Sequence, residues 1–315
     1  MEYLLLIISI LVIVKSADIL VDASVSIADN FKMPKILIAL TIMAFSTCAP
    51  ELAVSFTSIA AGNGTIAFAN VVGSCIINIL LVIGVAAVIN PIKVKDNTIK
   101  KELPLLLLIT LAFSTTLLEG ISSPQAAGIF SRSRGFLFVA LFSLFVIYIM
   151  QLVKARHKTE VEIDCKYSIK KAIIYFILSV IAIIISSDIL VDNAVIIADK
   201  LNISQKLITM VVIVIGTSLP ELIMTSIAAK KNEHDMAIGN IIGTNIFNIC
   251  IVLGLPITLL GDVAIVGFNV IDILFVAIAA VLLFFFANNG RRVSRREGIV
   301  LIGVFIAYYT YLILL

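Results

Sequence analysis

Long apolar runs follow one another from the start of the chain to its end, separated by short polar breaks. At about 1.5 Å per helical residue, a run of about 20 residues crosses the roughly 30 Å hydrocarbon layer of a membrane. Because 61% of the residues are hydrophobic and only 14% are charged, the chain has more apolar surface than a soluble domain buries. We therefore expect an all-α polytopic membrane protein.

Cutting the chain at its polar breaks predicts ten transmembrane helices, at residues 3–29, 36–61, 65–89, 103–119, 135–153, 172–199, 206–229, 236–260, 268–287 and 297–315. The first run lacks a preceding basic segment and a cleavage site of small residues, so we expect a permanent span and not a signal peptide. The four cysteines show no CxxC spacing, which favours reduced thiols over a disulfide framework or a zinc site. We expect no cofactor.

The basic residues lie mainly in alternate loops. The loops after the first, third, fifth, seventh and ninth spans carry 18 of the 23 Lys and Arg residues, and the other loops carry four. The positive-inside rule therefore places the loop 154–171 in the cytoplasm and both termini outside. We expect a multi-pass protein of the cell membrane. The mixed charges of the loop 154–171 indicate a solvated linker, and nothing indicates a nucleic-acid surface.

The sequence from Ser16 to Gly84 recurs 170 residues later without a gap, with 24 identities in 69 positions. SADILVDASVSIAD falls on SSDILVDNAVIIAD, TCAPEL on TSLPEL, and ANVVGSCIINILLVIG on GNIIGTNIFNICIVLG. The matches include Asp, Pro, Glu, Asn and Gly, so they go beyond shared apolar composition. Because each half has an odd number of spans, we expect two inverted-topology five-helix repeats, at 1–153 and 172–315, joined by the linker 154–171.

Each repeat carries a proline and a glutamate side by side in an apolar run, within the segments 41–84 and 211–254. Pro50 and Pro220 have no backbone N–H, so each should break its helix and free carbonyl oxygens. The adjacent carboxylates cost about 3 kcal/mol or more at this depth unless they are paired, protonated or bound to an ion. Each glutamate shares a helix face with hydroxyl side chains four residues away: Glu51 with Thr47 and Ser55, and Glu221 with Thr217 and Thr225.

A second polar stripe in each half consists of residues spaced by four: Asn70, Ser74 and Asn78, and Asn240, Thr244 and Asn248. Small residues beside it allow close helix packing: Ala69 and Gly73, and Gly239 and Gly243. Together the stripes offer carboxylates, hydroxyls and amides with no basic side chain nearby, which is typical of a hard-cation site. A bound cation cancels the carboxylate charge, whereas an empty charged site should resist a closed intermediate. This property favours the coupled exchange of cations over an uncoupled leak of one cation.

A structural role is the alternative for each motif alone, because proline-kinked helices with Ser and Thr are common in membranes. Two copies with paired glutamates favour a functional site. Two aspartate pairs have two possible roles. They could line a path for ions, or they could form interhelical salt bridges, with Lys15 as a candidate partner of Asp18. These pairs are Asp18 with Asp22, and Asp188 with Asp192.

At these residues the chain resembles the cation/calcium antiporter superfamily, most closely the prokaryotic type of its sodium/calcium exchanger branch. The two repeats of that branch carry GTSxPE and a following GxxxGSN-like segment. GTSLPE at 216–221 matches fully, and STCAPE at 46–51 matches more loosely. The resemblance implies a secondary antiporter that exchanges Ca²⁺ for several Na⁺ by alternating access, with the first and sixth spans sliding across a fixed core.

By that likeness, Glu51 and Glu221 would be central ligands shared by Ca²⁺ and Na⁺. The ligands around them would be the side chains of Thr47, Cys48, Ser74, Asn78, Thr217, Ser218, Thr244 and Asn248, and the backbone carbonyls of Ala44 and Val214. Two positions depart from the family pattern. Cys48 replaces the usual Ser and is a poor Na⁺ ligand, and Asn248 stands where many relatives have Asp, which argues against a potassium-dependent subtype.

Three other functions compete with this interpretation. A proton/calcium antiporter of the same fold would protonate the glutamates in place of binding Na⁺. An enzyme is disfavoured because the predicted spans contain no His, GxGD, HExxH or aligned Ser–Lys dyad. A channel is disfavoured by two inverted repeats within one chain. The expected partners are the ions and the lipid bilayer, and the sequence is compatible with a monomer without defining the oligomeric state.

Overall fold

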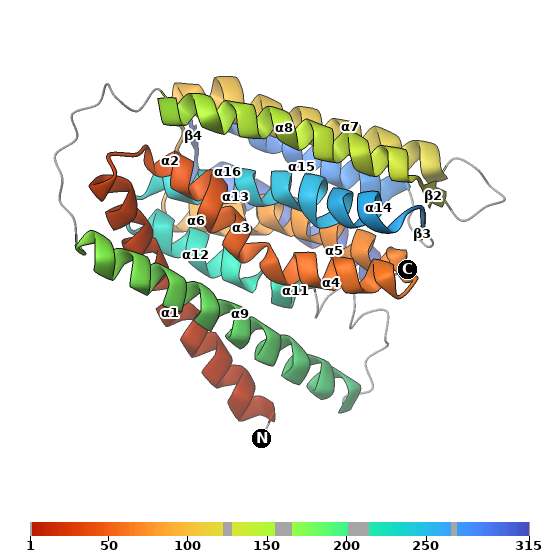
Figure 1. Ribbon diagram of the computed structural model, residues 1–315, viewed down its shortest axis with the longest axis horizontal. Coiled ribbons are helices and arrows are strands. Elements are labelled where there is room, and N and C mark those ends of the chain that lie inside the picture. Colours follow the sequence, from red (N-terminus) through yellow and green to blue (C-terminus); the bar gives the residue numbers. More distant parts are fainter. Residues whose placement is uncertain (1, 122–127, 155–165, 201–213, 266–269, 315) are drawn as a thin grey trace.

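The computed structural model describes residues 2–121, 128–154, 166–200, 214–265 and 270–314, and it is a bundle of long helices (Figure 1). Six helices are continuous over most of their length: α1 (Glu2–Asn30), α7 (Leu103–Ile121), α8 (Arg132–Lys154), α9 (Ile169–Lys200), α15 (Val270–Asn288) and α16 (Arg295–Leu314). A π-helical turn, η3 (Thr98–Glu102), precedes α7.

Four further helical stretches are interrupted by breaks or by π-helical turns. Two of them have a break: α2 (Lys35–Ile38), η1 (Ala39–Met43) and α3 (Ala44–Thr47) lead to α4 (Ala49–Ala60), and α11 (Val214–Thr217) leads to α12 (Leu219–Lys230). Two contain a π-helix: α5 (Gly64–Ile76), η2 (Ile77–Ile83) and α6 (Gly84–Ile89), and α13 (His234–Phe247), η6 (Asn248–Leu253) and α14 (Gly254–Leu260). Such turns frequently mark functional sites.

The described residues contain eight helices that are long and apolar enough to cross a membrane, or nine if the bent pair at residues 35–60 is one span. The all-helical polytopic architecture is therefore confirmed. The seventh predicted span, 206–229, begins outside the described residues, and its described part is helical on both sides of a break at Ser218. The count of ten spans and the inverted repeat stay predictions.

Two of the predicted spans differ from the structure in their details. The second span is not one straight helix, because it bends by 45° between Thr47 and Ala49. The fourth span begins at Thr98 and not at residue 103, because the polar sequence TIKKE continues the helix as a π-helical turn with Glu102 buried.

The loops after the odd-numbered predicted spans meet at one end of the bundle. Strand β1 (Ile92–Lys93) pairs antiparallel with β4 (Arg292–Val293), and the Asn90 side chain donates to the Asn232 side chain (3.0 Å). At the other end, β2 (Gly128–Phe130) pairs antiparallel with β3 (Val263–Ile265) (Figure 1). Alternate loops therefore lie at opposite ends, as expected for helices that cross a membrane in turn.

The stretches 64–89 and 234–260 form the centre of the bundle and are largely buried within the protein. Helices α1 and α9 pack against each other on one side of this centre, and α7 and α8 lie on the opposite side (Figure 1). Many apolar side chains of α1, α8 and α9 are exposed, which suits contact with lipid acyl chains. The central stretches are thus shielded by outer helices.

Candidate ion-binding site

The two proline–glutamate motifs break their helices at equivalent positions. Helix α3 ends at Thr47 and α4 begins at Ala49, and the second half repeats this arrangement between α11 and α12. The prolines occupy the first turn of α4 and α12, where a missing N–H removes no helical hydrogen bond. Glu51 and Glu221 follow in the same turns, where the positive end of the helix dipole favours a carboxylate.

Glycines let the two halves cross closely at the breaks. A Cβ added at Gly243 would lie 2.7 Å from the Ala44 Cβ, and one added at Gly73 would lie 2.6 Å from a Val214 methyl carbon. Each glycine of one half therefore faces a residue four positions before the break in the other half, Ala44 before Cys48 and Val214 before Ser218. The small residues predicted to permit close helix packing do so here.

Hydroxyl and thiol groups next to the breaks contact the central helix of the other half. The hydroxyl oxygens of Thr47 and Thr244 are 3.5 Å apart, and the Cys48 thiol donates to the Thr244 carbonyl at 3.6 Å. In the equivalent contact of the other half, the Ser218 hydroxyl donates to the Ser74 hydroxyl at 3.4 Å. All five side chains are buried.

The two glutamates meet inside this ring of polar groups. Glu51 is 1% exposed and Glu221 is 0% exposed, and their carboxyl groups lie close enough to interact electrostatically. Thr217 lies beside Glu51, and Thr47 lies beside Glu221, so each glutamate is approached by a hydroxyl from the other half. Within the described part of the chain, both Glu221 carboxyl oxygens and Oε2 of Glu51 have no hydrogen-bond partner.

Buried amides complete the cluster. Asn78 and Asn248 lie at the start of the π-helices η2 and η6, are 0% exposed, and have no hydrogen-bond partner among the described residues. The Asn70 amide donates to the Glu51 carbonyl at 3.3 Å and lies 3.5 Å from the Ser55 hydroxyl. Asn70 and Ser55 thus support the glutamate-bearing turn, although the ligands expected from the sequence do not include them.

Asn245 belongs to the buried polar set and was not anticipated from the sequence. It is 1% exposed, and its side-chain nitrogen and oxygen have no partner among the described residues. The spacing of four along α13 selects Asn240, Thr244 and Asn248 and passes over this position. Its place directly after Thr244 in GTNIFN was the available signal.

The carbonyls of Ala44 and Val214 already accept hydrogen bonds. The Ala44 carbonyl accepts from the Thr47 hydroxyl (3.1 Å) and the Cys48 amide (3.0 Å). The Val214 carbonyl accepts from the Thr217 hydroxyl and from the Ser218 amide, both at 3.2 Å. Either carbonyl would therefore need its hydroxyl donor to turn away before it could bind a cation.

The cluster has the chemistry of a site for a hard cation. Buried carboxyl and amide groups without partners are costly, and an ion with oxygen ligands removes that cost. Among the described residues, no group of three or more His, Cys, Asp or Glu side chains is placed to hold a metal ion. A cation held here would therefore depend on neutral oxygens in addition to the two carboxylates.

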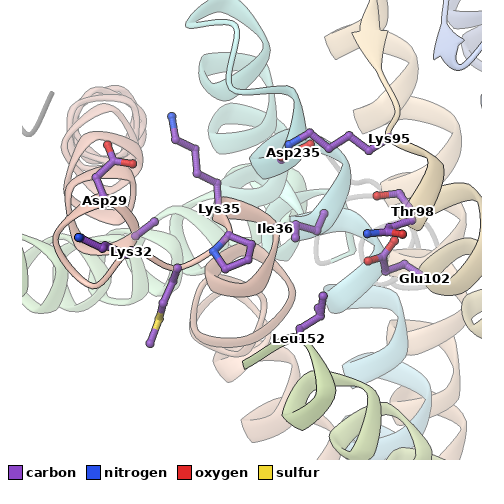
Figure 2. A pocket seen from close by; sticks show the side chains of 13 residues that line it. Asp29, Lys32, Lys35, Ile36, Lys95, Thr98, Glu102, Leu152 and Asp235 are labelled. Carbon is purple, nitrogen blue, oxygen red and sulfur yellow. Dashed lines mark hydrogen bonds and ion pairs between the residues drawn. The ribbon is translucent and has the colours of Figure 1, made fainter. Parts of the chain in front are cut away.

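A cavity of about 400 Å³ lies away from this cluster, at the end where the odd-numbered loops meet (Figure 2). It is lined by side chains of both charges, including Lys32, Lys35 and Asp235, and by Glu102. Glu102 is buried and accepts a hydrogen bond from the Tyr148 hydroxyl. None of the residues that line this cavity belongs to the glutamate cluster.

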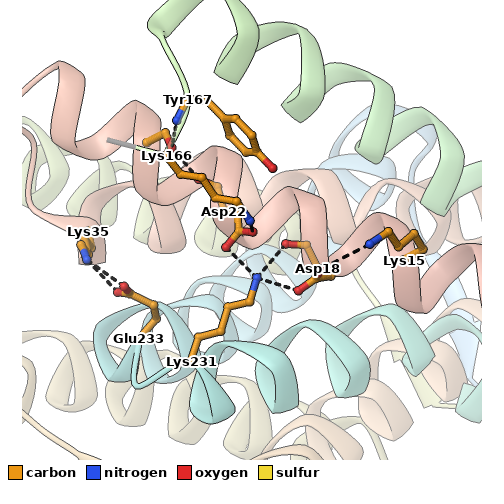
Figure 3. A network of polar contacts seen from close by, with 9 residues as sticks. Lys15, Asp18, Asp22, Lys35, Lys166, Tyr167, Lys231 and Glu233 are labelled. Atoms are coloured by element: carbon orange, nitrogen blue, oxygen red, sulfur yellow. Dashed lines mark hydrogen bonds and ion pairs between the residues drawn. The ribbon is translucent and has the colours of Figure 1, made fainter. Parts of the chain in front are cut away.

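The aspartate pairs, left open by the sequence, differ between the two halves. Asp18 and Asp22 form ion pairs with Lys231, and Lys15 lies 3.8 Å from Asp18 (Figure 3). These contacts support the salt-bridge interpretation for the first pair. Asp188 and Asp192 are exposed, so they are not held in the same way.

Comparison with known proteins places the chain in one family. It matches the family described as "Sodium/calcium exchanger protein" over residues 1–151 and 171–314. The protein CaxA of Alkalimonas amylolytica is 36% identical over 311 residues, which cover 96% of this chain and 95% of CaxA. The sodium/calcium exchanger MaX1 of Methanosarcina acetivorans is 28% identical over 344 residues, which cover 98% of this chain and 97% of MaX1.

Solved structures give the same result. The sodium-calcium exchanger NCX_Mj, soaked with Na⁺ and Sr²⁺, superposes with a TM-score of 0.82 and 29% identity over 98% of this chain and 99% of that one. The same exchanger soaked with neither Na⁺ nor Ca²⁺ also gives 0.82 and 29% identity, over 99% of this chain and 98% of that one. This multi-pass membrane protein belongs to the sodium/calcium exchanger protein family, a family of cation antiporters.

Proposed function

We propose that this chain exchanges Ca²⁺ for Na⁺ across the cell membrane, with Glu51 and Glu221 as the central ligands. The observation that carries the proposal is the pair of fully buried carboxyl groups, one from each half, with three of four oxygens lacking a partner among the described residues. Two carboxylates neutralise one Ca²⁺ or two Na⁺, so the two ions can use the same ligands in turn.

The neutral groups around the glutamates fit this role. Ca²⁺ takes about 6–8 oxygen ligands in adaptable geometry, which is more than two carboxylates supply. The buried hydroxyls and amides of both halves supply the remainder: Thr47, Ser74, Asn78, Thr217, Ser218, Thr244 and Asn248. The Ala44 and Val214 carbonyls can join when their hydroxyl donors turn away, and Cys48 is the one sulfur in the set.

Alternating access requires part of the protein to move relative to the site. Helices α1 and α9 make their most extensive contacts with each other, and they lie together beside the bundle (Figure 1). We infer that this pair slides as a unit past the central helices and exposes the glutamates first to one side and then to the other. Occupation by Ca²⁺ or Na⁺ neutralises the site and permits that movement, whereas two unneutralised carboxylates oppose it.

The positions of the loops support a membrane orientation. The odd-numbered loops, which carry most of the basic residues, gather at one end of the bundle. We propose that this end faces the cytoplasm, together with the linker 154–171, and that both termini lie outside.

Transport by the purified protein in proteoliposomes tests the proposal. An outward Na⁺ gradient should drive Ca²⁺ uptake when the pH is clamped to the same value on both sides. Liposomes with equal Na⁺ on both sides serve as the control and should show no uptake above that of empty liposomes. Ca²⁺ uptake that follows a pH difference and ignores Na⁺ would identify the proton/calcium antiporter instead.

A further inference from the structure

A lysine at the end of the ion-binding helix α12 joins that helix to α1. The Lys231 Nζ lies 2.6 Å from a carboxylate oxygen of Asp18, 2.6 Å from one of Asp22, and 3.1 Å from the Asp18 carbonyl (Figure 3). The Lys231 side chain is 29% exposed and the Asp22 side chain is 14% exposed, so this pair is better shielded than an ordinary surface ion pair, whereas the Asp18 side chain is 38% exposed. One ammonium group thus bridges two successive turns of α1.

The segment that leads into α9 contacts Asp22 and the turns of α1 that follow it. Lys166 forms an ion pair with Asp22, and this hydrogen bond raises the pKa of Lys166. The Tyr167 amide donates to the Ser26 hydroxyl at 3.3 Å, and the Asn30 side chain donates to the Tyr167 carbonyl at 3.2 Å. Asp22 therefore links α1, α12 and the start of the α9 segment.

The other half of the chain has the aspartates without the lysine. Asp188 and Asp192 correspond to Asp18 and Asp22 across the 170-residue offset, and Ala61 corresponds to Lys231. Both aspartates are exposed, and no described cation forms an ion pair with them. Helix α9 also packs much less closely against α4 than α1 packs against α12. Among the described residues, the lysine-bridged contact is therefore present at one end and absent at the equivalent end.

We propose that Lys231 is a positioning residue that latches α1 to α12 and stabilises the state in which the ion site is closed at this end. The inference rests on the proposed function, because it assigns a transport consequence to movement of α1. Lys231 lies ten residues after Glu221, or about 15 Å along a helix, so it acts on α1 and does not touch the ion. Sliding of the α1–α9 pair must break its ion pairs.

The latch has a consequence that a purely structural salt bridge lacks. A contact made in only one of two states changes their relative populations, and the apparent affinity on each side follows the fraction that is open to that side. Loss of the latch should increase the fraction open at the latch end. The apparent Ca²⁺ affinity should then rise about three- to tenfold on that side, with no rise on the opposite side.

The experiment measures Ca²⁺ dependence of transport from each side, using proteoliposomes of one orientation. Lys231→Gln should produce the one-sided rise, and Lys231→Arg should restore the wild-type values. Lys230→Gln is the matched control, because it removes an adjacent exposed lysine of the same helix end that forms no ion pair with a described residue. It should shift neither side.

A charge exchange keeps the proposal testable if Lys231→Gln disturbs folding. The pair Lys231→Asp and Asp22→Lys should recover part of the wild-type asymmetry that Lys231→Asp alone abolishes. Unchanged affinities in Lys231→Gln, or equal changes on both sides, would overturn the latch while Ca²⁺ exchange by the wild type still stands. Absence of Ca²⁺ exchange in the wild type would instead refute the proposed function.

Discussion

The segments that follow α4 and α12 occupy equivalent places in the two halves of the sequence, but they have different chemistry. AGNGT at 61–65 is uncharged, whereas KNEHD at 231–235 is charged and forms ion pairs. Both segments turn through a residue with positive φ, Gly62 at 78° and Asn232 at 62°. The backbone of the turn is therefore shared, and the side chains have diverged.

The breaks at the centre differ much less. Both halves retain a proline, a glutamate and a threonine in the same order, and each half places them against the other half. In the exchange that we propose, an ion reached from both sides in turn needs similar ligands from both halves. The two ends of the molecule, by contrast, face different solutions and carry different charges. We therefore propose that the centre determines which ion binds and that the ends influence which state is populated.

The largest effect is expected when the charge of one of the two central glutamates is removed. Glu51→Gln and Glu221→Gln should each abolish Ca²⁺ transport, because loss of one partner of a buried charged group costs about 3–5 kcal/mol, a hundredfold or more in affinity. Binding of Ca²⁺ to the purified protein, measured by titration calorimetry, and uptake into proteoliposomes check this result.

Each variant should still fold, because the substitution removes a charge from a site where three of the four carboxyl oxygens have no hydrogen-bond partner among the described residues. An unchanged elution profile and melting temperature in detergent would control for folding. Near-normal flux in one variant and none in the other would show that the halves do not contribute equally.

Much of this architecture follows from the sequence, for physical reasons. Apolar runs must be helical in a lipid layer, since every backbone polar group has to be satisfied internally. Pro50 and Pro220 then determine where two of those helices break, and the structure has both breaks next to these prolines. Gly73 and Gly243 were expected to permit close approach, and both face the opposite half.

Other features depend on contacts between distant parts of the chain. The pairing of Lys231 with Asp18 and Asp22 joins residues more than 200 positions apart, so the spacing of residues could not select it. Glu102 follows two lysines and was assigned to a loop, but the fourth span begins earlier and buries it against Tyr148. Asn245 is not predicted because the spacing of four residues along α13 selects Thr244 and Asn248 and passes over it.

The reciprocal glycine contacts offer a second comparison of the halves. A methyl group at Gly243 would meet the Leu40 carbonyl at 2.7 Å and the Leu40 Cα at 2.9 Å, which are backbone atoms. At Gly73 the nearest atom is a Val214 side-chain carbon at 2.6 Å, which can move more easily. Gly243→Ala should therefore destabilise the protein by about 2–3 kcal/mol and Gly73→Ala by about 1 kcal/mol.

Thermal unfolding in detergent measures the order of these effects. Gly303→Ala is the matched control, because no described atom beyond its own stretch of helix lies within 4 Å of a Cβ built there. It should leave the melting temperature unchanged or raise it slightly. A larger fall in melting temperature for Gly73→Ala than for Gly243→Ala would contradict the assignment of the tighter backbone contact to Gly243 in α13.

The asymmetry of the two ends can be reduced by giving the uncharged end a lysine. Ala61→Lys places an ammonium group at the position equivalent to Lys231, and the exposed Asp188 and Asp192 are the equivalents of Asp18 and Asp22. It should stabilise the state closed at that end and raise the apparent Ca²⁺ affinity at the Lys231 end about threefold. Ala61→Gln is the control for side-chain size, and an equal effect of both substitutions would exclude an ion pair as the cause.

The smallest expected effect concerns the one sulfur among the proposed ligands. Cys48 and Ser218 are equivalent positions, but a thiol is a poorer ligand for Na⁺ than a hydroxyl. Cys48→Ser should raise the apparent Na⁺ affinity about two- to fivefold, or ~0.5–1 kcal/mol, and Ser218→Cys should lower it by a similar factor. The Na⁺ dependence of Ca²⁺ release from loaded proteoliposomes measures both. A lower Na⁺ affinity in Cys48→Ser would contradict the role of Cys48 as a ligand. It would show that the contact of the thiol with the Thr244 carbonyl keeps the helix break in its binding geometry, so that Cys48 acts through packing.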